Sequence, residues 1–210
     1  GLRDADLGLA MNRLAVVIQE QRDYEGSVPL FNRAIWILDA SLGADHPHAA
    51  AARFNLATSL RHSGEPDRAA ELYEEVFPVL EKSYGSDHPN LGVVLNNHAN
   101  LLRAQGRYDR AEELLQRSLD IWSRSLGEDH PQVGWVLNNL GLVERQRGDH
   151  AAARSYFERS VAIAEAAYGP DHADVATQLK NLAEELHAMG EGPEAVALMR
   201  RALAIRERGY

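Results

Sequence analysis

Four Asp-His pairs recur along the sequence at a constant interval, and they are the first residues that could carry chemistry. The pairs are Asp45-His46, Asp87-His88, Asp129-His130 and Asp171-His172, each 42 residues after the one before. An imidazole beside a carboxylate is a combination that proteins use for general acid-base catalysis and for metal binding. The question is whether the fold can bring these pairs together.

The regular spacing argues against a shared metal or catalytic site. If each interval is one structural unit, equivalent histidines in neighbouring units lie on the order of 10 Å apart, the separation of packed helices. The ligands of one metal ion must lie within about 2 Å of it. We therefore interpret the Asp-His stretches as turns between helices, and we expect no metal, no cofactor and no catalytic residue.

Each of these turns contains residues suited to ending one helix, reversing the chain and starting the next helix. We expect the preceding glycines to end one helix in a left-handed conformation, the aspartates to cap the next helix, and the histidines to fill the turn. Proline follows in three copies and fits the first turn of a helix. The fourth copy has Ala173 instead and is expected to be the loosest. The four glycines are Gly43, Gly85, Gly127 and Gly169.

The whole chain follows this period, which is typical of a repeat array. Five repeats account for all 210 residues: 1–42, 43–84, 85–126, 127–168 and 169–210. Apolar residues recur at helical spacing in each repeat, and a glycine at 64, 106, 148 or 190 interrupts the pattern. We predict first helices near residues 4–21, 47–63, 89–105, 131–147 and 173–189, with second helices filling most of the intervals.

Small and bulky residues recur at fixed places on the two helices. The first helix has Ala15, Ala57, Ala99, Gly141 and Ala183, and the second has Phe31, Tyr73, Leu115, Phe157 and Met199. Such positions can interlock, but a lone hairpin cannot bury its apolar face, so the hairpins must stack. The predicted fold is all-α: a single right-handed superhelical solenoid of five antiparallel helical hairpins over residues 1–210.

The sequence between residues 137 and 156, with LNNLG, RQRGD, an alanine and a tyrosine, resembles the tetratricopeptide repeat. The length of 42 residues and the LGxDHP turn are similar to the kinesin light chain type of this repeat, which also occurs in bacterial signalling proteins. The resemblance extends over the whole chain. It implies that the first helices line a concave surface, where asparagines grip the main chain of an extended peptide.

Asparagine and arginine recur on the polar side of the first helices, at Asn55, Asn97, Asn139 and Asn181 and at Arg61, Arg103 and Arg145. Because asparagine is a poor helix former, its recurrence favours a role other than helix stability. An amide offers both donors and an acceptor, as binding to any peptide bond requires. The alternative is that these amides bond to one another and hold the repeats together.

On this basis we predict a peptide-binding surface. Its residues are Asn12, Arg13, Phe54, Asn55, Thr58, Arg61, His62, Asn96, Asn97, Asn100, Arg103, Trp135, Asn138, Asn139, Arg145, Lys180, Asn181 and His187. Glu20 and Glu184 lie on the same face, but its basic residues outnumber them. The net positive charge favours an acidic peptide or a terminal carboxylate. Trp135 is either an aromatic anchor or a packing residue.

We expect His98 to be a half-buried core residue, and the pairs Glu112-Glu113 and Glu184-Glu185 to lie on solvated helix faces.

Composition excludes several classes of protein. A formal charge of −9 argues against a nucleic-acid partner, and no apolar run is long enough to span a membrane. The absence of cysteine removes disulfides and cysteine nucleophiles, and no common nucleotide-binding, zinc-protease or hydrolase motif occurs. We expect a cytoplasmic protein that is not an enzyme.

Two functions fit these observations. The first is an interaction scaffold that binds an extended, acidic peptide segment in its groove. The second is a sensory or structural array in a larger bacterial signalling regulator, for example one that follows a nucleotide-binding ATPase domain, with the repeats contacting the parent's own domains. We also expect the packing face of the last hairpin, with Leu203, Ile205 and Tyr210, to be uncovered. Either the parent protein continues or two copies associate through their uncapped ends.

Overall fold

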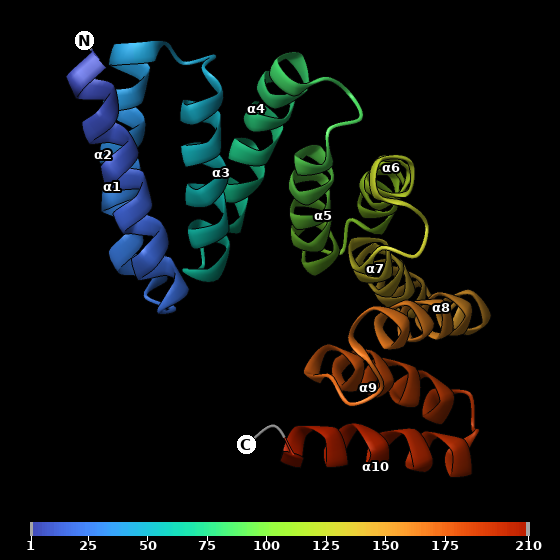
Figure 1. The fold of residues 1–210 in the computed structure, drawn as a ribbon. Coiled ribbons are helices and arrows are strands. Elements are labelled where there is room, and N and C mark those ends of the chain that lie inside the picture. The colour runs from blue at the N-terminus through green and yellow to red at the C-terminus, as the bar shows by residue number, and fades with distance from the viewer. Residues whose placement is uncertain (1, 209–210) are drawn as a thin grey trace. The chain divides into compact units, whose positions relative to one another are not determined.

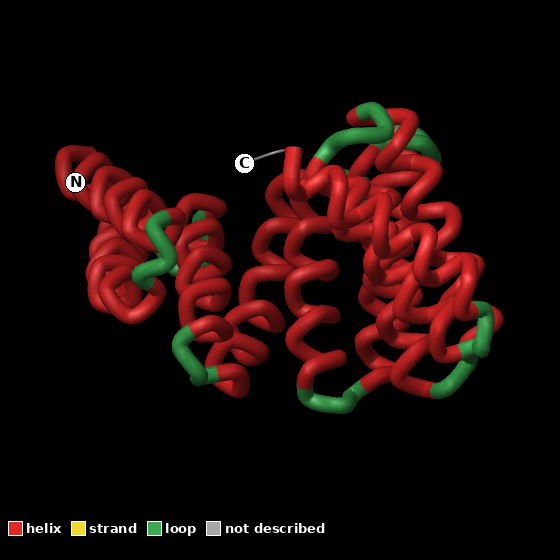
Figure 2. Tube along the Cα trace, turned by 90° about the horizontal axis from the view of Figure 1, so that it is seen from below, coloured by secondary structure: helices red, strands yellow, loops and turns green. Residues whose placement is uncertain are grey.

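The computed structural model describes residues 2–208, and in that part the chain forms ten α-helices and no strand (Figures 1 and 2). The helices are α1 (Leu2–Glu20), α2 (Tyr24–Leu42), α3 (Pro47–His62), α4 (Pro66–Tyr84), α5 (Pro89–Ala104), α6 (Tyr108–Leu126), α7 (Pro131–Arg147), α8 (His150–Tyr168), α9 (Ala173–Ala188) and α10 (Gly192–Arg208). The predicted hairpins are confirmed, and α3, α5, α7 and α9 begin at the predicted residues.

The helices fall into two compact units, Gly1–Leu102 and Arg103–Tyr210. In the first unit, α1 packs on α2, α2 on α3 and α3 on α4; in the second, each helix from α6 to α10 packs on the next. The first helices of neighbouring repeats also touch, α1 with α3 and α7 with α9. This last contact places their polar sides next to one another. That all five repeats act as one array stays a prediction.

The core of each hairpin is the predicted interlock of small and bulky residues. Phe31, Tyr73, Leu115 and Phe157 are fully buried, as are the small residues of the facing helices. At Gly141 a methyl group would lie only 2.7 Å from the Phe157 ring, so ring and backbone are in close contact there. Met199 is the exception, because it lies on the outer side of the last hairpin and is exposed.

In the turns between repeats, histidine rather than aspartate caps the next helix. The Nδ1 atoms of His46, His88, His130 and His172 accept hydrogen bonds from the backbone N–H two residues further on, at 3.1, 3.2, 3.3 and 3.2 Å. The predicted roles of the Asp and His were therefore wrong. The first helical residue is proline in three copies and has no N–H, so the next N–H needs the acceptor, and the imidazole reaches it.

Two of the aspartates, Asp129 and Asp171, bind arginines of second helices instead. Asp129 accepts a hydrogen bond from Arg159 at 2.6 Å, and Asp171 forms an ion pair with Arg208 at 3.2 Å. The fourth turn keeps its histidine cap, and α9 begins at Ala173, where the other copies have proline. The Asp-His pair thus joins two neighbouring elements, with the aspartate on one and the histidine on the other.

The glycines that begin these turns have positive φ, as predicted, but not the left-handed helical conformation. Gly127, for example, has φ 96° and ψ 154°. This combination of positive φ and extended ψ is essentially restricted to glycine. It turns the chain away from the end of the second helix, so that the Asp-His segment can reach the start of the next repeat.

The histidine cap gives a first prediction. We expect His130→Ala to lower the free energy of unfolding by about 1 kcal/mol, because the orphan N–H of Gln132 loses its acceptor. His130→Asn should retain most of the stability, since asparagine is a good N-cap. Urea titration followed by circular dichroism measures both. His187→Ala, at an exposed position late in α9, is the control. Equal losses in the Ala and Asn variants would show that the cap contributes nothing.

Candidate functional site

Every residue predicted to bind peptide lies on the first helix of its hairpin. The asparagines among them, in α1, α3, α5, α7 and α9, are all half-buried. Half-burial is what a groove-lining amide requires, but it also suits an amide that bonds to a neighbouring helix. The hydrogen bonds distinguish these two roles at individual positions.

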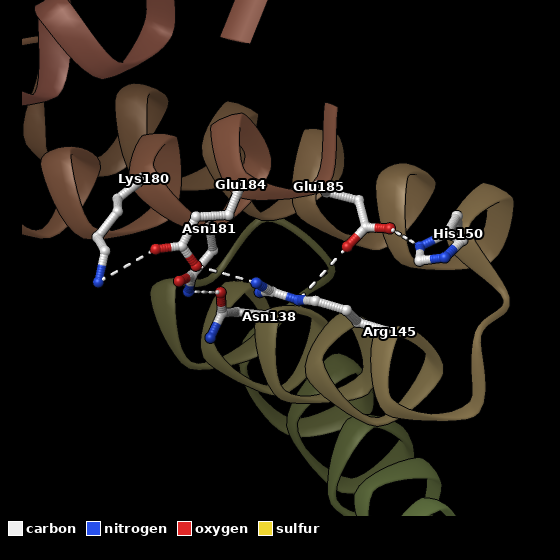
Figure 3. Close-up of polar contacts among 7 residues, drawn as sticks. All are labelled: Asn138, Arg145, His150, Lys180, Asn181, Glu184 and Glu185. Carbon is white, nitrogen blue, oxygen red and sulfur yellow. Dashed lines mark hydrogen bonds and ion pairs between the residues drawn. The ribbon is translucent and has the colours of Figure 1, made fainter. Parts of the chain in front are cut away.

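Two pairs of asparagines bond to one another across neighbouring repeats. In the first unit Asn55 Nδ2 donates to Asn12 Oδ1 at 3.3 Å, and in the second Asn181 Nδ2 donates to Asn138 Oδ1 at 2.7 Å (Figure 3). Gln19 also donates to the Asn55 carbonyl oxygen at 3.0 Å. These bonds join α1 to α3 and α7 to α9, as the alternative interpretation expects. Each amide retains donors or acceptors for a further partner.

Arg145 of α7 lies between two carboxylates of α9. Its Nη1 donates to Glu184 Oε2 at 2.9 Å, and its Nε lies 3.3 Å from Glu185 Oε2 (Figure 3). The guanidinium also stacks over the Phe157 ring at 5.0 Å from the centroid. On its other side, Glu184 binds Lys180 at 3.3 Å. The positive charges of Arg145 and Lys180 are therefore neutralised within the chain.

The two glutamates differ in their surroundings. Burial opposes the ionisation of Glu184, but hydrogen bonds from Arg145 and Lys180 outweigh it and hold the pKa of Glu184 below its usual value. The Glu185 side chain is 0% exposed, and its Oε1 lies 2.6 Å from His150 Nδ1 of α8 (Figure 3). The prediction that this pair lies on a solvated face was therefore wrong for Glu185.

The glutamates of α6 are closer to the prediction. Glu113 is exposed and pairs with Arg110 one turn earlier, and Glu112 is half-buried beside Arg147. Arg147 also reaches Asp109 at 2.6 Å and Glu144 at 3.1 Å. This cluster is an ion network that fastens α6 to α7, and sequence reasoning did not foresee it.

Arg103 of α5 occupies the same repeat position as Arg145 but has no carboxylate partner in residues 2–208. It is half-buried. Its Nε is buried without a hydrogen-bond partner in that part of the chain, as is the Nε of Arg145, so the two arginines differ in their carboxylate neighbours. Burial, and then the nearby charge of Arg145, lower the pKa of Arg103. Asn97, on the same helix, is half-buried, and in the described residues no hydrogen bond involves its side chain. These are groups that an external partner can satisfy.

The aromatic candidates take different environments. Trp135 is 42% exposed, so part of its side chain is packed and part is accessible to a partner. Phe54 packs against Tyr73 and borders a cavity of about 180 Å³ that Leu80, Tyr84 and Val93 also line. His62 stacks on Tyr24, and burial followed by the charges of Arg61 and Arg22 lowers its pKa. His98 lies in the core, stacked on Tyr73.

A metal-binding group and a membrane-spanning helix are two further kinds of functional feature that the described part of the chain could contain. Residues 2–208 contain no group of three or more His, Cys, Asp or Glu side chains that could hold a metal ion. Among the helices described there, none is both long and apolar enough to cross a membrane. The polar faces of the first helices are thus the main candidate site.

Helical hairpins of constant length with polar first-helix faces define a repeat scaffold of the solenoid class. The family profile of the tetratricopeptide repeat matches residues 6–82, 55–109, 90–166 and 136–208. The chain therefore belongs to the tetratricopeptide repeat family.

Solved structures agree with this assignment and with the kinesin light chain type of repeat. The structure of BtubC (BKLC) from P. vanneervenii superposes with a TM-score of 0.84 at 26% identity, covering 100% of this chain and 84% of that one. Nearly identical TPR-like repeats of a putative kinesin light chain from Podosopora anserina give a TM-score of 0.79 at 25% identity, covering 98% and 97%. MamA, at 16% identity and a TM-score of 0.61, covers 93% and 95% and shares the fold. No curated protein matches the sequence significantly.

The contrast between Arg145 and Arg103 gives a second prediction. Arg145→Leu should lower the free energy of unfolding by about 3 kcal/mol, because it leaves Glu185 buried without its arginine. Arg103→Leu is the matched control at the same repeat position, and it should change stability by less than about 1 kcal/mol. Urea unfolding followed by the fluorescence of buried Trp122 measures both. Similar losses in the two variants would contradict the assignment of the ion cluster.

Proposed function

We propose that the chain is a protein-interaction scaffold, without enzymatic activity, that binds an extended peptide containing acidic groups along its first helices. Membership of the tetratricopeptide repeat family supports a protein partner. The observation that carries the acidic preference is Arg103, a half-buried guanidinium without a carboxylate partner in the described residues. A cysteine-free scaffold also suits a reducing compartment such as the cytoplasm.

Arg103 favours an anion for an electrostatic reason. It is partly removed from water and lies close to a second positive charge, that of Arg145, and both effects destabilise its charged form. Arg145 is compensated by Glu184 and Glu185, whereas Arg103 has no such compensation. A carboxylate of the peptide would fill for Arg103 the role that Glu184 fills for Arg145, with a charge-assisted hydrogen bond of about 1.5 to 3 kcal/mol.

The other free groups suit a peptide main chain and an apolar side chain. Asn97 can donate to a peptide carbonyl oxygen and accept from a peptide N–H, whatever the side chain between them. In the first unit, the cavity beside Phe54 has room for a small apolar side chain. In the second unit, exposed Trp135 offers an aromatic surface. Affinity built from such terms is of micromolar order.

The test begins with an acidic peptide selected from a display library against the 210-residue chain. Arg103→Glu should weaken its binding by about 10-fold or more, because the variant places a second negative charge beside the peptide carboxylate. The loss should shrink at high salt, which screens partly exposed charges. Calorimetry at two salt concentrations measures it. Arg110→Glu, on the exposed side of α6, is the control and should bind as the natural chain does.

Asn97→Ala tests the amide contact separately. It should weaken binding several-fold for acidic and neutral peptides alike, while leaving the melting temperature unchanged or raised, since alanine is the better helix former. Asn181→Ala, which loses the bond to Asn138, should instead lower the melting temperature. Unchanged affinity in both Arg103→Glu and Asn97→Ala would show that the peptide binds elsewhere.

A further inference from the structure

The first helix exposes apolar side chains at positions that every later repeat buries. On α1, Leu7, Leu14 and Val17 are 53%, 52% and 49% exposed and lie at helical spacing on one side. The buried residues at the equivalent positions of α3, α5, α7 and α9 are Ala49, Leu91, Val133 and Val175 for Leu7; Leu56, His98, Leu140 and Leu182 for Leu14; and Ser59, Leu101, Val143 and Glu185 for Val17. This α1 stripe (Leu7, Leu14, Val17) is therefore an unpartnered packing face.

The last helix shows the complementary pattern. On α10, Val196, Met199 and Leu203 are 50%, 40% and 57% exposed. The expectation of an uncovered side chain was wrong for Ile205, which is buried, and Tyr210 lies outside the described residues. The residues that precede Met199 at its repeat position, Phe31, Tyr73, Leu115 and Phe157, are all buried. Leu203 corresponds to Val161 of α8, which is also buried. We call Val196, Met199 and Leu203 the α10 stripe; Met199 and Leu203 occupy the positions that form the second-helix half of the contact between repeats.

The contact between α8 and α9 shows how the two stripes fit. There, Phe157 and Val161 of α8 share one apolar cluster with Val175 and Leu182 of α9. Met199 and Leu203 stand at the positions of Phe157 and Val161, whereas Leu7 and Leu14 stand at those of Val175 and Leu182. The α10 stripe and the α1 stripe are thus the two halves of a contact that the chain already makes within itself.

We propose that the α10 stripe of one copy packs against the α1 stripe of a second copy of this chain, as α8 packs against α9. Helices in that arrangement run antiparallel, because α8 and α9 are consecutive and joined by a short turn. The last turn of α10, with Arg206, then lies beside the first turns of α1, with Asp6. Opposite charges therefore meet at the edge of the apolar contact.

The geometry of this association determines its stoichiometry. Each copy offers one α1 stripe and one α10 stripe, and the two are different surfaces. Such a heterologous contact is not self-limiting unless it closes into a ring, so copies add in sequence as concentration rises. The contact is independent of the peptide-binding surface, because it uses the apolar side of α1 and the outer side of α10.

The experiment is a complementation test with the 210-residue chain. Sedimentation velocity and light scattering should show that the average mass of the natural chain rises with concentration above the 23.2 kDa of one copy. Leu14→Glu removes the α1 stripe and Leu203→Glu removes the α10 stripe, so each variant alone should stay at the mass of one copy. An equimolar mixture retains one intact stripe of each kind and should form a one-to-one complex. Met189→Glu, at an exposed apolar residue directly after α9, is the control and should associate as the natural chain does.

Three results would overturn the proposal: a natural chain that stays at the mass of one copy, a single variant that still associates, or a mixture that does not. Association of only one variant would indicate a symmetric contact through the other stripe. Both substituted residues are exposed, and circular dichroism checks that the variants are folded. If either is not, Val17→Lys and Met199→Lys supply a second pair with the same expected outcomes. Peptide binding by the single variants should be unchanged, which separates this test from that of the proposed function.

Discussion

The close approach of a small residue on the first helix to a bulky residue on the second is the constraint on which the rest of the structure depends. Where Gly141 meets Phe157, ring and backbone are in direct contact, and the same pairing of types recurs through the repeats. The first helices of neighbouring repeats also touch, α1 with α3 and α7 with α9. These contacts bring Asn12 within hydrogen-bonding distance of Asn55, and Asn138 within hydrogen-bonding distance of Asn181.

A surface built by repetition acquires specificity where the repeats differ. Arg103 and Arg145 hold the same position, but α9 supplies Glu184 and Glu185 to Arg145, and the described chain supplies no carboxylate to Arg103. The asparagines show the same division, because Asn138 and Asn181 bond to each other while Asn97 has no such bond. One set of residue types therefore joins neighbouring helices in some repeats, and in others we propose that it binds a ligand.

Most of the fold could be predicted from the sequence because it depends on local signals repeated five times. The prolines predicted the first residues of α3, α5 and α7. The 42-residue period then predicted the start of α9, which begins with alanine. The cap was mispredicted because aspartate is the commoner N-cap, whereas the choice between Asp129 and His130 depends on which side chain reaches the N–H of Gln132. The burial of Glu185 could not be predicted, since it depends on Arg145 and His150 converging from two other helices. The sequence signal for its burial was its repeat position, which Val143 and Leu101 occupy in earlier repeats.

We propose that Arg103 is a cationic group available to an acidic ligand, whereas Arg145 is occupied within the chain. The most direct measurement is the NMR resonance of each Arg Nε–H during titration with a selected acidic peptide. The resonance of Arg103 should shift in a saturable way and its exchange with water should slow. The resonance of Arg145 should change little, because its guanidinium is held by a hydrogen bond to Glu184 and an ion pair with Glu185. A saturable shift of backbone resonances with no change at Arg103 would contradict the account.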